Sequence, residues 1–118
     1  MKDVIRSCLK LGLIHFETAR MYGSSEVQFV DALTSLMEEG TVRREDFVFQ
    51  TKLMIGSGSR AQFEKEWEAS WSNVGKLGYV DLFAFHLLSN ESQIDNILDD
   101  ADDGIFDFVL NLQKEGKV

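Results

Sequence analysis

Four residues of the sequence, Glu17, Tyr22, Lys52 and His86, have side chains suited to acid–base chemistry. An acid, a phenol, an ammonium and an imidazole together can transfer a proton to a carbonyl oxygen. A free tyrosine has a pKa of about 10, and an adjacent ammonium lowers that pKa because it favours the phenolate. A carboxylate beside the lysine would keep it charged and oriented, and a histidine can donate to the same carbonyl oxygen. The four residues can act together only if the fold brings them to one place.

The elements that must position these residues follow from two alternating hydrophobic periods. Apolar residues at helical spacing predict helices over residues 2–11, 25–39, 59–75 and 105–114, and short apolar runs predict strands over 13–16, 47–53 and 79–86. Ser25 and Ser59, each followed three residues later by glutamine, predict capping boxes that open the second and third helices. A polar loop is expected between the third strand and the last helix. The inward helical faces are expected to carry Phe29, Val30, Leu33, Leu36 and Met37, and then Phe63, Trp67, Trp71 and Val74.

This order of elements predicts an α/β protein with a parallel sheet, because strands separated by full helices run parallel with right-handed crossovers. The carboxyl ends of parallel strands meet at one rim, where catalytic residues lie in such folds. Glu17, Lys52 and His86 each fall at a predicted carboxyl end, and Tyr22 follows Glu17 closely in the next loop. We therefore expect all four side chains to converge on that rim.

Three segments carry a resemblance to a known family. They are HFETARMYGSSE at residues 15–26, DFVFQTKL at 46–53 and LGYVDLFAFH at 77–86. Together they resemble the aldo-keto reductase family, whose members show an acid-Thr-Ala with Tyr-Gly and Ser-Glu after it, a Thr-Lys that closes the next strand, and an aspartate-led strand that ends in histidine. The resemblance covers nearly the whole chain, in the family's order and spacing.

The resemblance implies a (β/α)8 barrel, or TIM barrel, that reduces aldehydes or ketones with NADPH. In the family, hydride passes from the nicotinamide to the carbonyl carbon, and a tyrosine protonates the oxygen. Carried over to this sequence, Tyr22 would be the general acid, Lys52 its pKa-lowering neighbour and His86 the orienting donor. Glu17 would pair with Lys52 and contribute to the NADP site. No metal ligand set is predicted.

One departure from the family pattern falls at Glu17, where most members carry aspartate. An added methylene can be absorbed by a rotamer change, but a displacement near 1 Å can cost about a hundredfold in rate. The glutamate in HFETAR also resembles a branch of the family that has a C-terminal iron-sulfur segment.

The length of the chain, 118 residues, is less than half of the roughly 250 residues of a (β/α)8 barrel. We therefore expect residues 1–118 to be one partial domain that supplies the second to fourth strands of a longer protein, and Val118 to begin a further strand. Two hypotheses stay open. The first is a fragment of an NADPH-dependent carbonyl reductase. The second is a non-catalytic α/β binding or interaction module derived from a truncated barrel, which self-associates through its open sheet edges.

Composition limits the partners. The net charge of −8 argues against nucleic acid and anionic membranes, which would repel the chain. The partner that the resemblance implies is a small-molecule carbonyl substrate. The single cysteine, Cys8, excludes a disulfide framework or a cysteine-based metal site within the chain. No apolar run approaches the ~20 residues of a membrane span. These features favour a cytoplasmic protein.

Two loops are similar to ligand-binding motifs but lack a required residue. Residues 56–61 match a glycine-rich dinucleotide loop, yet the acid expected at the end of the following strand is missing. Residues 99–104 are similar to a calcium loop, but Ala101 occupies a ligand position, and Leu110 stands where the closing glutamate belongs. We interpret the first as a flexible loop on the rim and the second as an acidic loop that favours the start of the last helix. His15, within a strand, is assigned a structural role.

Overall fold

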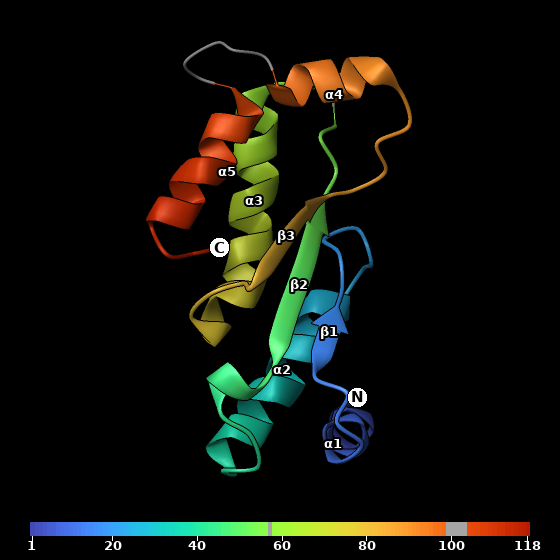
Figure 1. The fold of residues 1–118 in the computed structure, drawn as a ribbon, viewed down its shortest axis with the longest axis vertical. Helices are drawn as coiled ribbons and strands as arrows, with labels where there is room; N and C mark the ends of the chain where they lie inside the picture. The colour runs from blue at the N-terminus through green and yellow to red at the C-terminus, as the bar shows by residue number, and fades with distance from the viewer. Residues whose placement is uncertain (57, 99–103) are drawn as a thin grey trace.

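The computed structural model describes residues 1–56, 58–98 and 104–118, which form a parallel sheet with helices packed against it (Figure 1). The elements in chain order are α1 (Lys2–Lys10), β1 (His15–Glu17), α2 (Ser25–Glu38), β2 (Val48–Leu53), α3 (Arg60–Val74), β3 (Leu82–Phe85), α4 (Glu91–Leu98) and α5 (Ile105–Lys114). Short 3-10 turns at Arg44–Asp46 and Gly75–Leu77 precede β2 and follow α3. The predicted alternation of helices and strands is confirmed.

The three strands pair in the order β1-β2-β3, and both pairings are parallel. Glu17 lies opposite Gln50, and Lys52 lies opposite Ala84. Along β2 the side chains alternate strictly between buried and partly exposed positions, as the two-residue period of a strand requires. One face of the sheet therefore carries the apolar core, and the other presents Lys52 and its neighbours.

The core forms two apolar clusters on the helix-covered face. One joins α1 and α2 to the beginnings of the strands, and the other joins α3 and α5 to their ends. Trp67 is fully buried, and its ring stacks on that of Trp71, with 5.6 Å between centroids. α3 and α5 lie side by side (Figure 1). The inward faces predicted for the second and third helices are confirmed.

The capping box predicted at Ser25 is wrong, because the N-cap of α2 is Ser24 and it makes no side-chain cap to the helix backbone. The N-cap is Ser24, whose hydroxyl oxygen accepts a hydrogen bond from the Gln28 side chain at 2.7 Å. Ser25 is the first helical residue, and its hydroxyl instead accepts from Thr18. The predicted cap of α3 is confirmed, since the Gln62 N–H donates to Ser59 Oγ.

The segment predicted as a polar loop contains a helix, α4, which the sequence pattern did not indicate. It is eight residues long, and Ile97 is its buried apolar residue. Ile94, Ile97 and Leu98 have the helical spacing i, i+3 and i+4, but this pattern covers little more than one turn, which is too short to distinguish a helix from a polar loop. The acidic residues Asp99–Asp103, interpreted above as a loop, lie outside the described residues.

Candidate active site

The predicted site residues come from consecutive βα units of the sheet. Glu17 is the last residue of β1, Lys52 is next to last in β2, and His86 directly follows β3. Tyr22 lies in the loop between β1 and α2. The strands are in register, so their carboxyl ends bring Glu17, Lys52 and His86 to one rim, and the loop places Tyr22 beside them.

Successive contacts connect all four side chains. Lys52 Nζ donates to Oε1 of Glu17 and lies 3.3 Å from the Tyr22 hydroxyl. That hydroxyl is 3.5 Å from Nε2 of His86. The rings of Tyr22 and His86 meet edge to face, with centroids 5.4 Å apart. The hydroxyl of Tyr22 therefore lies between the ammonium and the imidazole.

The ion pair at this rim changes the acidity of both its members. The hydrogen bond from Lys52, together with its positive charge, holds the pKa of Glu17 below its ordinary value. The hydrogen bond to Glu17 raises the pKa of Lys52 against the opposing effect of burial. Lys52 is largely covered, whereas the Glu17 side chain is 49% exposed. Lys52 thus stays charged, and its only direct anionic contact in the described residues is Glu17.

The imidazole of His86 presents one nitrogen to the rim. Nε2 faces the Tyr22 hydroxyl, while Nδ1 is buried and has no hydrogen-bond partner among the described residues. The next residue, Leu87, has a φ of 57°, in the left-handed region that a branched residue seldom adopts. The backbone therefore turns sharply directly after His86, just beyond the end of β3.

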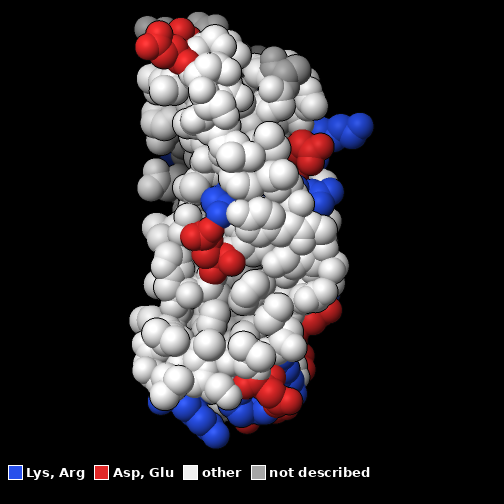
Figure 2. Space-filling model, turned by 90° about the vertical axis from the view of Figure 1, so that its right-hand side faces the viewer, with Lys and Arg blue, Asp and Glu red and all other residues white. Residues whose placement is uncertain are grey.

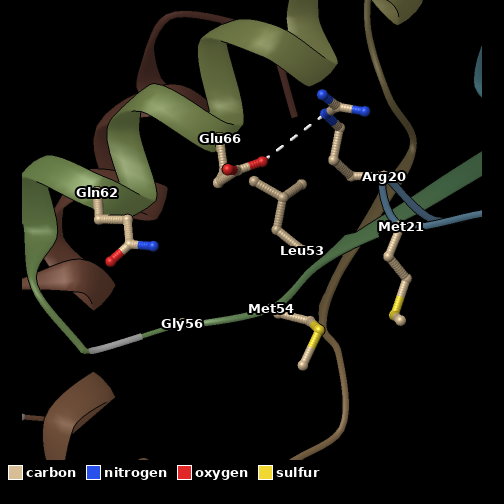
Figure 3. Close-up of a pocket in the computed structure, with 7 residues that line it drawn as sticks. All are labelled: Arg20, Met21, Leu53, Met54, Gly56, Gln62 and Glu66. Carbon is tan, nitrogen blue, oxygen red and sulfur yellow. Dashed lines mark ion pairs between the residues drawn. The ribbon is translucent and has the colours of Figure 1, made fainter. Parts of the chain in front are cut away.

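A cavity of about 340 Å³ lies on the same rim, beside the four residues rather than among them. Met21 and Met54 give it apolar walls, and Arg20 and Glu66, which also line it, form an ion pair at 3.8 Å (Figure 3). Gly56 from the glycine-rich loop also lines it. Met21 directly precedes Tyr22, so the cavity adjoins the proton-transfer residues.

Sequence reasoning missed the buried acid Glu26. It is 1% exposed and accepts hydrogen bonds from Thr51 Oγ1 at 2.7 Å, Ser70 Oγ at 2.5 Å and Asn73 Nδ2 at 3.0 Å. A signal was available, because Glu26 precedes Phe29, Val30 and Leu33 at the helical spacing of the inward face. An acid on that stripe predicts a buried, hydrogen-bonded carboxylate.

Two other kinds of site receive no support. Among the described residues, no group of three or more His, Cys, Asp or Glu side chains could hold a metal ion. No helix in the described ranges is long and apolar enough to cross a membrane. His15 lies on β1, where its Nε2 is 3.0 Å from Oε1 of the Gln50 side chain, so it links the two strands.

The parallel sheet, its crossover helices and the polar rim define this chain as part of a (β/α)8 barrel, because similar solved structures with this fold match it over nearly its whole length. The family profile described as "Aldo/keto reductase family" matches residues 1–118. The chain belongs to the aldo/keto reductase family, a family of oxidoreductases that use NADP(H). The predicted family and fold class, a parallel-stranded fragment of a TIM barrel, are confirmed.

Curated relatives match part of the chain. An uncharacterized oxidoreductase of Schizosaccharomyces pombe is 36% identical over 84 residues, which are 71% of this chain and 30% of that protein. Prostaglandin F synthase 1 of Bos taurus is 31% identical over 84 residues, or 25% of its own length. The matched region thus spans between a quarter and a third of these relatives.

Solved structures match the chain almost end to end. An aldo-keto reductase from a Medee basin deep-sea metagenome library has a TM-score of 0.70 and 25% identity, with 99% of this chain and 38% of that chain covered. The aldose reductase of Schistosoma japonicum has a TM-score of 0.71 and 21% identity, with 99% and 42% covered. A third similar structure, at 22% identity, is an aldo-keto reductase in complex with NADPH.

Proposed function

We propose that the protein to which this chain belongs reduces an aldehyde or ketone to an alcohol with NADPH, and that Tyr22 is its general acid. The observation that carries this proposal is the position of the Tyr22 hydroxyl, 3.3 Å from Lys52 Nζ and 3.5 Å from His86 Nε2. A phenol in that position has a cation ready to stabilise its phenolate and an imidazole beside it to bind the substrate oxygen. We further propose that residues 1–118 form one partial domain of the barrel.

Glu17 provides an acceptor that suits the ribose of the nicotinamide cofactor. Among the described residues, Glu17 uses Oε1 for Lys52, and its half-exposed carboxylate keeps Oε2 open as an acceptor. A hydroxyl of the nicotinamide ribose is a donor that such an oxygen can bind. Glu17 would thus hold the nicotinamide end of NADPH next to Tyr22.

Each of the four side chains would have a separate role in the reaction. When bound, NADPH supplies the hydride that reaches the carbonyl carbon. Tyr22 donates its hydroxyl proton to the carbonyl oxygen, and the Lys52 ammonium stabilises the phenolate left behind. Glu17 keeps Lys52 charged and aimed at Tyr22. His86 donates from Nε2 to the carbonyl oxygen and fixes its angle.

The substitution Tyr22→Phe tests this proposal in the protein that carries this chain. It removes the proton donor and keeps the ring, so kcat for carbonyl reduction should fall by about 10²- to 10⁴-fold. NADPH affinity, measured by fluorescence quenching, should stay unchanged. The chain's other tyrosine provides the matched control, Tyr79→Phe, which should keep full activity. Undiminished kcat in Tyr22→Phe would refute the assignment.

A second candidate function is a non-catalytic binding or interaction module. It is favoured by the open edge of β1, which has a neighbour on one side only among the described strands. A titration with NADPH separates the two candidates. Quenching of nicotinamide fluorescence together with carbonyl turnover supports the reductase, and the absence of both supports the module.

A further inference from the structure

Two buried threonines stand next to the ion pair of the proposed site. Thr18 follows Glu17, and Thr51 precedes Lys52. Both are 0% exposed, because alternation along a strand sends neighbouring side chains to opposite faces of the sheet. The ion pair therefore lies on the open face, and the two threonine hydroxyls lie behind it, under α2.

The first two residues of α2 accept hydrogen bonds from these hydroxyls. Thr18 Oγ1 donates to Ser25 Oγ at 2.8 Å, and Thr51 Oγ1 donates to Glu26 Oε1 at 2.7 Å. Ser25 and Glu26 are adjacent in the chain and begin the helix. The first turn of α2 thus binds both threonines, Thr18 next to Glu17 and Thr51 next to Lys52.

The carboxylate of Glu26 is itself fixed from the other side. Ser70 and Asn73 of α3 donate to its two oxygens at 2.5 and 3.0 Å. A buried carboxylate only accepts hydrogen bonds, and these donors together with the amino end of α2 compensate its burial. Glu26 therefore joins α2, β2 and α3 at the level of the rim, and its position is not free to vary.

We propose that Ser25 and Glu26 are positioning residues, which hold Thr18 and Thr51 so that Glu17 and Lys52 stay in contact on the opposite face of the sheet. The proposal gives a physical reason for two pairs that the family pattern contains and the proton-transfer scheme leaves unused, Ser-Glu at 25–26 and the threonines beside the charged residues. Its consequence for catalysis rests on the function proposed above. Its consequence for the ion pair does not.

A pair of matched variants tests the proposal. Thr51→Val and Ser70→Ala each remove one hydroxyl that donates to Glu26 Oε1, so both remove a buried hydrogen bond of the same acceptor. Only Thr51 adjoins Lys52. In NMR titrations of the ¹³Cε-labelled lysines, Thr51→Val should lower the pKa of Lys52 by about half a unit or more. Ser70→Ala should leave that titration where it is in the parent protein.

Two further variants distinguish a specific effect on Lys52 from a general loss of stability. Thr51→Ser keeps the hydroxyl and should restore the titration of Lys52. Glu26→Gln keeps an oxygen acceptor for Thr51, and the Asn73 amide can turn to meet its new amino group, so it should also resemble the parent. If Thr51→Val and Ser70→Ala were equally destabilised in urea and the Lys52 titration moved in neither, the role of Glu26 would be structural and the proposal wrong.

Kinetics in the same variants separate this proposal from the proposed function. If the protein reduces carbonyls, Thr51→Val should lower kcat several-fold more than Ser70→Ala, with the KM for NADPH unchanged in both. If Lys52 shifts as expected and no carbonyl is reduced by the parent protein, the positioning role stands and the proposed function fails. If the parent protein reduces carbonyls and the pKa of Lys52 does not change in Thr51→Val, the proposed function stands and the positioning role fails.

Discussion

At the scale of single residues, Glu17 shows how the rim accepts a longer acid than the aspartate common in the family. Its carboxylate reaches Lys52 Nζ directly, and its side chain remains half exposed. The longer side chain therefore still forms the ion pair with Lys52. The contact that orients Lys52 is kept, which is the requirement the proposed chemistry places on this position.

The lowered pKa of Glu17 predicts a pH-dependent stability. A carboxyl with a depressed folded pKa stabilises the fold above its unfolded pKa, about 4.3, and loses that contribution as the pH falls through the folded value. Because Glu17 is half exposed, the contribution should be about 0.5 kcal/mol or less. The raised pKa of Lys52 works in the opposite sense, so its contribution is complete below about 10.4 and is lost only above that pH.

Urea unfolding of Glu17→Gln against the parent protein, from pH 3 to pH 8 in steps, would measure this effect. The variant should be less stable near neutrality and equal to the parent at the acid end. Glu68→Gln, at an exposed glutamate without an ion pair among the described residues, serves as the control and should show no such convergence. A constant difference between Glu17→Gln and the parent at all pH values would contradict the linkage.

At the scale of the elements, the amino ends of β2 and β3 are joined by Arg44. Its guanidinium donates to the carbonyls of Leu77 and Tyr79 and to Oδ2 of Asp81, at 2.7 to 3.1 Å. It also lies over the Tyr79 ring, 3.7 Å from the centroid. Asp81 in turn accepts from the N–H of Phe49 in β2. This cluster sets the relative position of the two strands at the end opposite to the rim.

Arg44→Lys should therefore destabilise the fold by about 2 kcal/mol, because lysine keeps the charge but cannot place donors on several acceptors at once. The adjacent Arg43 gives a matched control, since it is 72% exposed and bonds only within its own turn among the described contacts. Arg43→Lys should change stability by no more than about 0.5 kcal/mol. Equal effects of the two substitutions in urea unfolding would contradict the role assigned to Arg44.

At the scale of the whole molecule, large apolar side chains are exposed on the open face of the sheet and near its β1 edge. Leu13 and Ile14, just before β1, are about half exposed, and so is Leu82 on the open face. Figure 2 shows a long face on which charged side chains are sparse between the two ends. Exposed strand edges with few charges pair readily with other strands, so we expect the isolated chain to associate with itself along β1.

Sedimentation equilibrium of the 118-residue chain tests this expectation. The mass-average molecular mass should exceed the 13.4 kDa of the monomer. Ile14→Lys should bring the measured mass back toward 13.4 kDa, because a lysine at the edge of a sheet opposes strand pairing. Leu98→Lys, which places a lysine at an exposed apolar position of α4, should leave the association unchanged. A monomeric parent chain would exclude this use of the edge.

Local patterns in the sequence determined most of the elements and the end of each strand. Helical and strand periods are properties of neighbouring residues, so α1, α2, α3 and α5 could be predicted, as could the three strands. The inward faces of α2 and α3 could be predicted with them, whereas the buried residues of α5 are Ile105 and Leu112 and the predicted Phe106 is 43% exposed. Glu17, Lys52 and His86 could be placed at strand ends for the same reason, and parallel topology then predicted their convergence.

Only the tertiary structure decided which partners those residues meet. Ser24 and not Ser25 is the N-cap of α2, and the hydroxyl of Ser25 accepts from Thr18. Glu26 is buried because donors from β2 and α3 reach it together. Lys52 lies between Glu17 and Tyr22 because two strands and a loop meet there. Each of these contacts joins residues from separate elements, and a period measured along one segment holds no information about the segment packed against it.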